Sequence, residues 1–366
     1  MTFTATVAPV APGAGTPTGT VTFVITGGPT LTATLAGGTA SVTTSALSVG
    51  THTVTATYSG AANFTASTGT DTQTVNLAAT TTTVTSTPDP SVVGQPVTFT
   101  ATVAPVSPGA GTPTGTVTFV ATDGVTTVTL TGTLSGGTTS VTTSGLVTAG
   151  AYIVTATYSG DGSFTSSVGT DTQTVAQAAT TTTVTSTPDP SVVGQPVTFT
   201  ATVAPVSPGA GTPTGTVTFV ATDGVTTVTL TGTLSGGTTS VTTSGLVTAG
   251  TYTVTATYSG AANFTTSTGS DTQTVNQAAT TTTVTSFPDP SVFGQSVTFT
   301  ATVAPVAPGA GTPTGTVTFV ITGGPTLTAT LAGGTASVTT SALSVGTHTV
   351  TATYGGDANF TASSDT

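Results

Sequence analysis

Residues 97–103 read Val-Thr-Phe-Thr-Ala-Thr-Val, a strict alternation of apolar residues and threonine. Successive side chains of a β-strand point to opposite faces, so this period of two places the apolar residues on one face and the threonines on the other. The same seven residues return at 197–203 and 297–303. We therefore expect a strand with one buried face that recurs along the chain.

The recurring strand belongs to a longer repeat. Residues 78–150 recur without change as 178–250, and residues 2–57 recur without change as 298–353. A spacing of about 100 residues indicates a tandem array of one module, and this length can hold one small core per copy. We expect four copies, at residues 1–77, 78–177, 178–277 and 278–366.

The two ends of the chain interrupt the repeat. Met1 stands where the second copy has Val97, inside a strand, and Thr366 aligns with Thr70. We therefore expect the first copy to lack its first strand, the fourth copy to lack its last strand, and both ends to be cuts in a longer protein.

Composition excludes several classes of function. The chain has no Lys or Arg, its eleven acidic residues are all Asp, and its formal net charge is -11. Without cations it cannot bind nucleic acid by counterion release or be attracted to anionic membranes. It has no Cys, and therefore no disulfide or thiolate metal site. No apolar run approaches the ~18 residues of a membrane span, so we expect no direct membrane insertion.

The second copy shows seven strand patterns separated by turn signals. Pro88 and Pro90 end the first pattern and place it at a sheet edge. Seven short strands at this spacing predict an antiparallel β-sandwich. The patterns are a strand that opens at Thr80–Thr83, then Val97–Val103, Thr116–Ala121, Val128–Leu134, Thr139–Thr143, Tyr152–Tyr158 and Asp171–Val175.

Two strings carry a resemblance to a known family. Residues 94–103 (GQPVTFTATV) and 252–260 (YTVTATYSG) are similar to tandem bacterial immunoglobulin-like (Big-type) repeat domains of surface and adhesin-like proteins. Leu146 with residues 150–154 resembles the tyrosine corner of immunoglobulin-like sandwiches. The resemblance covers essentially the whole chain and implies an all-β array of such sandwiches, used mostly as spacers.

The corner position holds His52, Tyr152, Tyr252 and His348 in the four copies. The resemblance implies a packed, hydrogen-bonding ring at this position. The alternative, that the histidines ligate a metal or act as a base, is weaker because two copies have no His and no Ser–His–Asp set is visible. We expect no catalytic residue, no metal and no cofactor.

Two further kinds of site have weak signals. Calcium needs several oxygen ligands, and Asp89 with Asp161 near a junction is the one candidate pair; we favour turn aspartates that accept backbone N–H bonds. Asn63, Asn263 and Asn359 each begin an Asn-Phe-Thr triplet, which matches the N-glycosylation acceptor. The interpretation that we favour is a turn Asn beside a buried Phe.

The junctions and edges bear on assembly. Only residues 176–179 separate the last strand of the second copy from the next copy, without Gly or Pro. We therefore expect copies placed end to end in an extended rod. The edge strands have Pro but no Lys to protect them, which favours lateral or end-to-end self-association.

We expect a non-catalytic stalk segment of an extracellular bacterial surface or adhesin-like protein. A self-associating filament or matrix subunit is one alternative. A carbohydrate- or surface-binding adhesin module that uses the loop Pro105–Gly115 is another, and it is disfavoured because the few Phe and Tyr fall on core parity. If the chain is a stalk, a host-surface or carbohydrate ligand would be bound through other domains of the protein. An enzyme has no nucleophile–base pair to support it.

Overall fold

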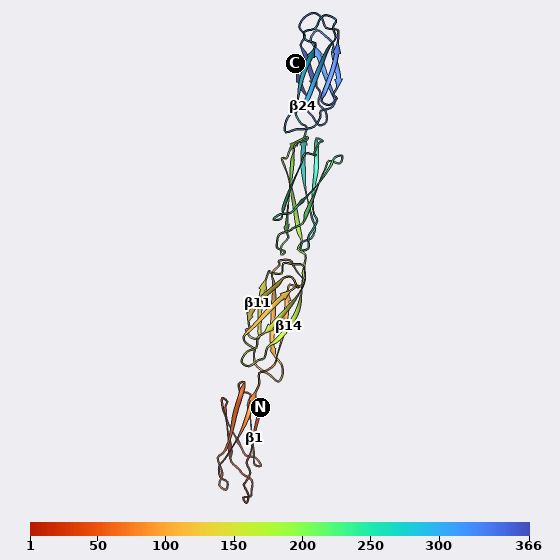
Figure 1. The fold of residues 1–366 in the computed structure, drawn as a ribbon. Coiled ribbons are helices and arrows are strands. Elements are labelled where there is room, and N and C mark those ends of the chain that lie inside the picture. The colour runs from red at the N-terminus through yellow and green to blue at the C-terminus, as the bar shows by residue number, and fades with distance from the viewer. The chain divides into compact units, whose positions relative to one another are not determined.

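The computed structural model describes all 366 residues and consists of β-strands, turns and loops. It contains no helix able to cross a membrane. The chain divides into two compact units, which are described separately. The first unit is Met1–Ser91, Pro96–Leu146 and Gly150–Val175, and the second is Val92–Gln95, Val147–Ala149 and Ala176–Thr366. Each copy of the repeat forms two facing sheets (Figure 1).

The second copy shows the complete arrangement of one module. Its sheets have the strand orders β12-β9-β7 and β11-β10-β13-β14-β8. Neighbouring strands of the smaller sheet are antiparallel, with Val84 of β7 opposite Ala101 of β9. The strands are β7 (Thr80–Thr87), β8 (Ser91–Val92), β9 (Val97–Pro105), β10 (Thr116–Thr122), β11 (Thr127–Thr133), β12 (Thr138–Thr143), β13 (Gly150–Tyr158) and β14 (Ser167–Ala176).

The third copy repeats this topology, with the orders β15-β17-β20 and β16-β22-β21-β18-β19. Its short strand β16 pairs in parallel with β22, whereas the other pairings are antiparallel. The strands are β15 (Thr180–Thr187), β16 (Ser191–Val192), β17 (Val197–Pro205), β18 (Thr216–Thr222), β19 (Thr227–Thr233), β20 (Thr238–Thr243), β21 (Gly250–Tyr258) and β22 (Ser267–Asn276).

The first and fourth copies have fewer strands. The first copy has the sheets β1-β4 and β3-β2-β5-β6, and the fourth has β23-β24-β27 and β26-β25-β28-β29. The strands are β1 (Thr2–Thr6), β2 (Thr20–Ile25), β3 (Thr30–Thr34), β4 (Thr39–Thr43), β5 (Gly50–Tyr58), β6 (Ser67–Val75), β23 (Thr280–Phe287), β24 (Val297–Pro305), β25 (Thr316–Ile321), β26 (Thr326–Thr330), β27 (Thr335–Thr340), β28 (Val350–Tyr354) and β29 (Ser363–Asp365).

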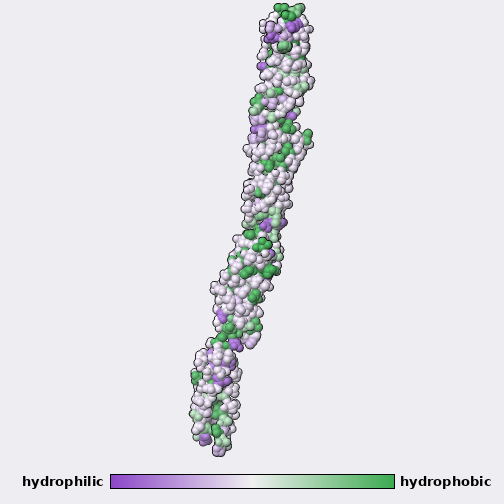
Figure 2. Space-filling view, in the orientation of Figure 1, coloured by the Kyte–Doolittle hydropathy of each residue, from purple (hydrophilic) through white to green (hydrophobic).

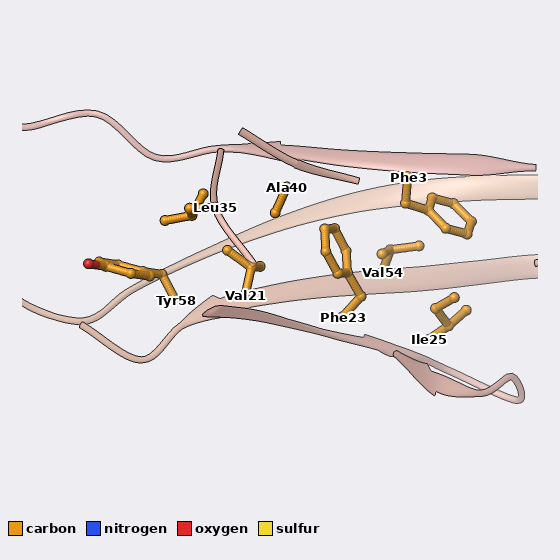
Figure 3. Close-up of a cluster of buried hydrophobic side chains, with 8 residues drawn as sticks. All are labelled: Phe3, Val21, Phe23, Ile25, Leu35, Ala40, Val54 and Tyr58. Atoms are coloured by element: carbon orange, nitrogen blue, oxygen red, sulfur yellow. The ribbon is translucent and has the colours of Figure 1, made fainter. Parts of the chain in front are cut away.

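The core of each copy lies between its two sheets. Along β9 the apolar residues of the alternation are buried, and Phe99 is fully inaccessible. Its ring stacks on that of Phe119 from the opposite sheet, with centroids 6.3 Å apart. In the first copy the corresponding cluster includes Phe3, Phe23 and Val54, which point into the space between the layers (Figure 3). Alternation therefore fixes which face of each strand becomes the core.

The predicted two-sheet β-sandwich is confirmed, with three differences. The strand β8 was not expected, because two residues between prolines give no alternation. The last strand begins at Ser167 rather than Asp171, since pairing with β13 starts opposite Tyr158. For the same reason the fourth copy, expected to lack its last strand, has the first three residues of it as β29.

The expectation that the Phe and Tyr side chains fall on core parity is wrong for one residue of the fourth copy. Phe287 is 78% exposed. It has the outward parity of Thr87, which is also exposed, and its ring therefore faces solvent.

Candidate functional site at the junctions between copies

The fourth copy is bonded to the third through two of its loops. The Ala249 amide donates to Oδ1 of Asn359 (2.9 Å). The Ala310 amide donates to the Val193 carbonyl oxygen (3.0 Å). Gly194 lies so close to Ala310 that a Cβ built on it would stand 2.7 Å from the Ala310 carbonyl oxygen. The junction is therefore a tight contact of main-chain segments, fixed by one asparagine side chain.

The same contacts recur one copy earlier, within the second unit. The Ala149 amide donates to Oδ1 of Asn263 (2.9 Å), and Nδ2 of Asn263 donates to the Val147 carbonyl oxygen (3.1 Å). The Ala210 amide donates to the Val93 carbonyl oxygen (3.0 Å). Both ends of the Asn263 amide are thus used, and the side chain holds the segment Val147–Ala149 of the same unit.

A glutamine holds the linker that precedes each of these two copies. Nε2 of Gln277 donates to the Asp357 carbonyl oxygen (2.7 Å), and Nε2 of Gln177 donates to the Ala261 carbonyl oxygen (3.0 Å). The Ala278 amide donates to the carbonyl oxygen of Asn359 (2.9 Å). The loop that carries the clamp is therefore bonded both to its own linker and to the preceding copy.

The junction between the first and second copies has different residues at these positions. Leu77 replaces the linker glutamine, and Ser163 replaces the clamp asparagine. Ser163 is exposed, and its hydroxyl makes none of the bonds that Asn263 makes. The linker amide still bonds to this loop, from Ala78 to the Ser163 carbonyl oxygen (2.9 Å). Main-chain pairing within the copy is retained, while the side-chain clamp is absent.

The predicted corner position brings a ring against the chain in each copy. His52 is buried, with Nδ1 2.7 Å from the Thr26 carbonyl oxygen and Nε2 2.8 Å from that of Ser48. Bonding to both carbonyls requires a proton on each nitrogen, hence the imidazolium form. These carbonyls, that of Thr26 first, raise the pKa of His52 above its usual value. The ring of His52 is therefore packed against the main chain and bonded to two of its carbonyl groups.

His348 has the same environment in the fourth copy. The carbonyl oxygens of Ser344 and Thr322 each lie 2.7 Å from a ring nitrogen, and they raise the pKa of His348. In the third copy Tyr252 occupies this position, and its hydroxyl bonds to that of Thr248, four residues upstream. Tyr152 is fully buried at the same place in the second copy.

The two calcium candidates are occupied by protein donors. Oδ2 of Asp161 accepts bonds from the amide (2.9 Å) and hydroxyl (2.6 Å) of Thr114. These bonds, the hydroxyl first, lower the pKa of Asp161 to about 2. Asp89 accepts a bond from the Thr174 amide (2.9 Å). No three His or Asp side chains come together in an arrangement that could hold a metal ion.

The three Asn-Phe-Thr asparagines differ in their surroundings. Asn63 is exposed, whereas Asn263 and Asn359 are partly buried in the clamps. A glycan is attached through Nδ2, and in Asn263 this atom bonds to Val147. N-glycosylation remains a prediction, and Asn63 is the acceptor whose side chain is accessible.

The visible surface is mostly of near-neutral hydropathy, with scattered hydrophobic and hydrophilic patches (Figure 2). The apolar side chains with the highest exposed fraction are Val125 and Val225, each 90% exposed, and both lie in turns. Neither sheet face carries a cluster of charged side chains, since the chain has no Lys or Arg to pair with its Asp residues.

Each copy is a two-sheet sandwich, and in three copies the ring at the corner position bonds to the residue four positions earlier in the chain. These features define an array of immunoglobulin-like domains. The sequence matches the family described as bacterial Ig-like domain (group 3) at residues 1–76, 84–176, 184–276 and 282–366. The chain belongs to this family, and the resemblance seen in its sequence is confirmed. No curated protein sequence matches the chain.

Several solved structures share the fold. Escherichia coli alpha-2-macroglobulin activated by porcine elastase is 13% identical, with a TM-score of 0.25; the match covers 96% of this chain and 40% of the macroglobulin. The E. coli adhesin FdeC is 15% identical, with a TM-score of 0.25, over 77% of this chain and 95% of FdeC. Invasin, a bacterial integrin-binding protein, is 18% identical, with a TM-score of 0.41, over 74% of this chain and 56% of invasin. At such identities the likeness is one of fold alone.

The junction residues were not recognised in the sequence as a functional set. Asn263 and Asn359 were considered as turn or glycosylation residues, and Gln177 and Gln277 were not singled out. A signal was present in the differences between copies, because Leu77 and Ser163 change together at the first junction. The main-chain amides and carbonyls that bond to these side chains could not be recognised, because every residue type carries the same main-chain groups.

Proposed function

We propose that this chain is a spacer segment of an extracellular bacterial surface protein. Its copies would set the distance between an anchoring part and a distal part of the protein. The observation that carries the proposal is the clamp between the third and fourth copies, in which Oδ1 of Asn359 accepts a bond from the Ala249 amide. A bonded junction restricts the angle between copies, and this is a property that a spacer needs and a set of independent binding modules does not.

Two features support the proposal. The chain has no Arg and no Trp, and its visible surface is mostly of near-neutral hydropathy (Figure 2), so the array offers few anchors for a tight protein partner. The amide nitrogen of the buried Gln173 also bonds within its own copy: Nε2 donates to the Pro88 carbonyl oxygen (3.1 Å) and to Oγ of Ser91 (3.2 Å).

The test uses the array as a support for a binding domain of known ligand, displayed on cells. Removal of residues 178–277 deletes one whole copy, and we expect weaker binding to ligand fixed on an opposing surface but unchanged binding to soluble ligand. Replacing these residues by an unrelated domain of similar length should restore surface binding. Equal surface binding by the shortened array would contradict the proposal, as would surface binding by the repeats alone.

Self-association is the second candidate, and the exposed valines of the hairpin turns favour it. Val125 and Val225 each project at the tip of a hairpin, after β10 and after β18 respectively. Edge strands without charge add to this tendency. Sedimentation velocity at rising concentration separates the candidates, because a spacer stays monomeric and a filament subunit does not.

The adhesin alternative has one observation in its favour. Phe287 is exposed in the fourth copy, where the second and third copies have Thr. Exposed rings are a common platform for carbohydrate stacking. Replacing it by the residue of the other copies (Phe287→Thr) should abolish glycan-array binding under this alternative and change nothing for a spacer.

A further inference from the structure

The first and last strands of the third copy run side by side in the same direction. Thr180 at the start of β15 donates to Oγ of Ser267 at the start of β22 (2.8 Å). Ser191 of β16, which follows β15, lies opposite Val275 near the end of β22 in a parallel pairing. The chain therefore enters this copy beside one end of β22 and leaves it from the other end.

Side chains bond these two strands to each other. The Thr182 hydroxyl lies 2.7 Å from that of Ser267, and the Ser186 hydroxyl donates to Oδ2 of Asp271 (2.8 Å). The strand β15 belongs to the smaller sheet and β22 to the larger one, so they are not paired as neighbours in one sheet. The hydroxyl and carboxylate bonds thus join the two sheets along one edge of the sandwich.

The buried amide of Gln273 continues this row of bonds beyond β15. Its Nε2 donates to the Pro188 carbonyl oxygen (3.1 Å) and to Oγ of Ser191 (3.2 Å). The Thr274 amide donates to Oδ1 of Asp189 (2.9 Å). The segment between β15 and β16 is therefore also held to the last strand through side chains.

The second copy has the same bonds at the same positions. The Ser86 hydroxyl donates to Oδ2 of Asp171 (2.7 Å), and Nε2 of Gln173 donates to the Pro88 carbonyl oxygen (3.1 Å). These residues lie in the first compact unit, and their counterparts in the third copy lie in the second. We call this set of side-chain bonds between the first and last strands of a copy the side-chain ladder.

Tension applied to the two ends of the chain loads the side-chain ladder in shear. It pulls the start of the first strand and the end of the last strand in opposite directions along their common axis. Because the two strands are parallel, they separate by sliding past each other, and the bonds of the ladder then have to break together. A pair of strands opened from one end would instead lose its bonds one at a time.

We propose that the side-chain ladder bears mechanical tension and sets the force at which each complete copy unfolds. The chain has no Cys to form a disulfide across the sandwich, so noncovalent contacts have to carry the load. This inference rests on the proposed spacer function, since an array is stretched only when its two ends are held by different surfaces.

The test holds the 366-residue chain by its two ends at constant force in optical tweezers and measures the dwell time before each unfolding step. Ser186→Ala removes the bond to Asp271 in the third copy, and the double variant Ser86→Ala, Ser186→Ala removes it in the second copy as well. A bond that is broken in the transition state contributes its whole free energy to the unfolding rate, so we expect at least about fivefold faster unfolding, in one step and in two steps respectively.

The matched control is the double variant Ser140→Ala, Ser240→Ala. These serines bond to Thr100 and Thr200 (2.8 Å each) within the smaller sheet, and the bonds stay formed while the first and last strands separate. We expect the control to unfold under force at the rate of the unmodified chain. Equal acceleration by both double variants, or by neither, would overturn the proposal. Faster unfolding of the ladder variants alone, together with full surface binding by the array without residues 178–277, would refute the spacer function and leave the ladder as the element that resists force.

Discussion

Outward-facing threonines on neighbouring strands bond to one another across the small sheet. The hydroxyls of Thr98 and Thr142 are 2.8 Å apart, and those of Thr100 and Ser140 are also 2.8 Å apart. Such cross-strand pairs contribute about 0.2–1 kcal/mol each. A β-branched residue with a hydroxyl therefore gives this chain both strand propensity and a polar surface, in a sequence without Lys, Arg or Glu.

The core phenylalanines should dominate the stability of each copy. Phe99→Ala removes a fully buried ring that stacks on Phe119, and we expect a loss of about 3–5 kcal/mol in the free energy of unfolding of the second copy. Hydrogen exchange of peptides from β13 measures this loss, because β13 differs in sequence from β21. Unchanged protection of β21 in the third copy serves as the control. An equal loss of protection in β13 and β21 would contradict the expectation that each copy has a core of its own.

The histidines should make the first and fourth copies sensitive to pH. The folded pKa of His52 and His348 is raised, so the stabilisation is present in full below the unfolded pKa of about 6.5 and is lost as pH rises through the folded value. We expect a lower melting temperature at pH 8.5 than at pH 5.5. The double variant His52→Tyr, His348→Tyr carries the residue of the other copies and should lose this dependence. NMR titration of the two imidazoles checks the direction, and midpoints below 6.5 would refute it.

At the scale of the strands, alternation was sufficient to predict most of the fold. The strands β9 and β13 have long apolar–threonine patterns and were predicted within a few residues. The strand β8 and the beginning of β14 were missed, because β8 has two residues and Ser167–Thr170 contains no buried apolar residue. The clamp was not predicted, because the partners of its asparagine are main-chain groups of the preceding copy, which no residue type in the sequence reveals.

Close packing of β7 on β14 makes one glycine essential. A Cβ on Gly169 would overlap the Thr82 carbonyl oxygen, so Gly169→Ala should destabilise the second copy by about 1–3 kcal/mol, as overpacking does. Gly69→Ala is the matched control in the first copy and should be neutral. Hydrogen exchange of β13 and β5 peptides measures each effect, and equal effects of the two variants would contradict the assigned packing.

At the scale of the whole chain, the copies are similar but their junctions are not. The junction between the third and fourth copies carries an asparagine clamp and a linker glutamine, and the first junction carries Ser163 and Leu77 instead. Hydrogen bonds of this kind contribute about 0.5–1.5 kcal/mol each. A few such bonds are enough to favour one arrangement of neighbouring domains that would otherwise move relative to one another.

The junctions should therefore differ in stiffness within a single molecule. The chain has no Cys, so cysteine pairs introduced at exposed threonines can be spin-labelled without background. We expect the distance distribution between labels at Thr32 and Thr129, across the first junction, to be about twofold broader than that between Thr229 and Thr328, across the third. Asn359→Ala should broaden the second distribution toward the first, because it removes the acceptor of the Ala249 amide. Asn63→Ala changes the same loop of a copy whose asparagine is exposed and should leave both unchanged. Distributions of equal width in the unmodified chain would show that the clamp does not restrict the junction, and the spacer function would then have to rest on length alone.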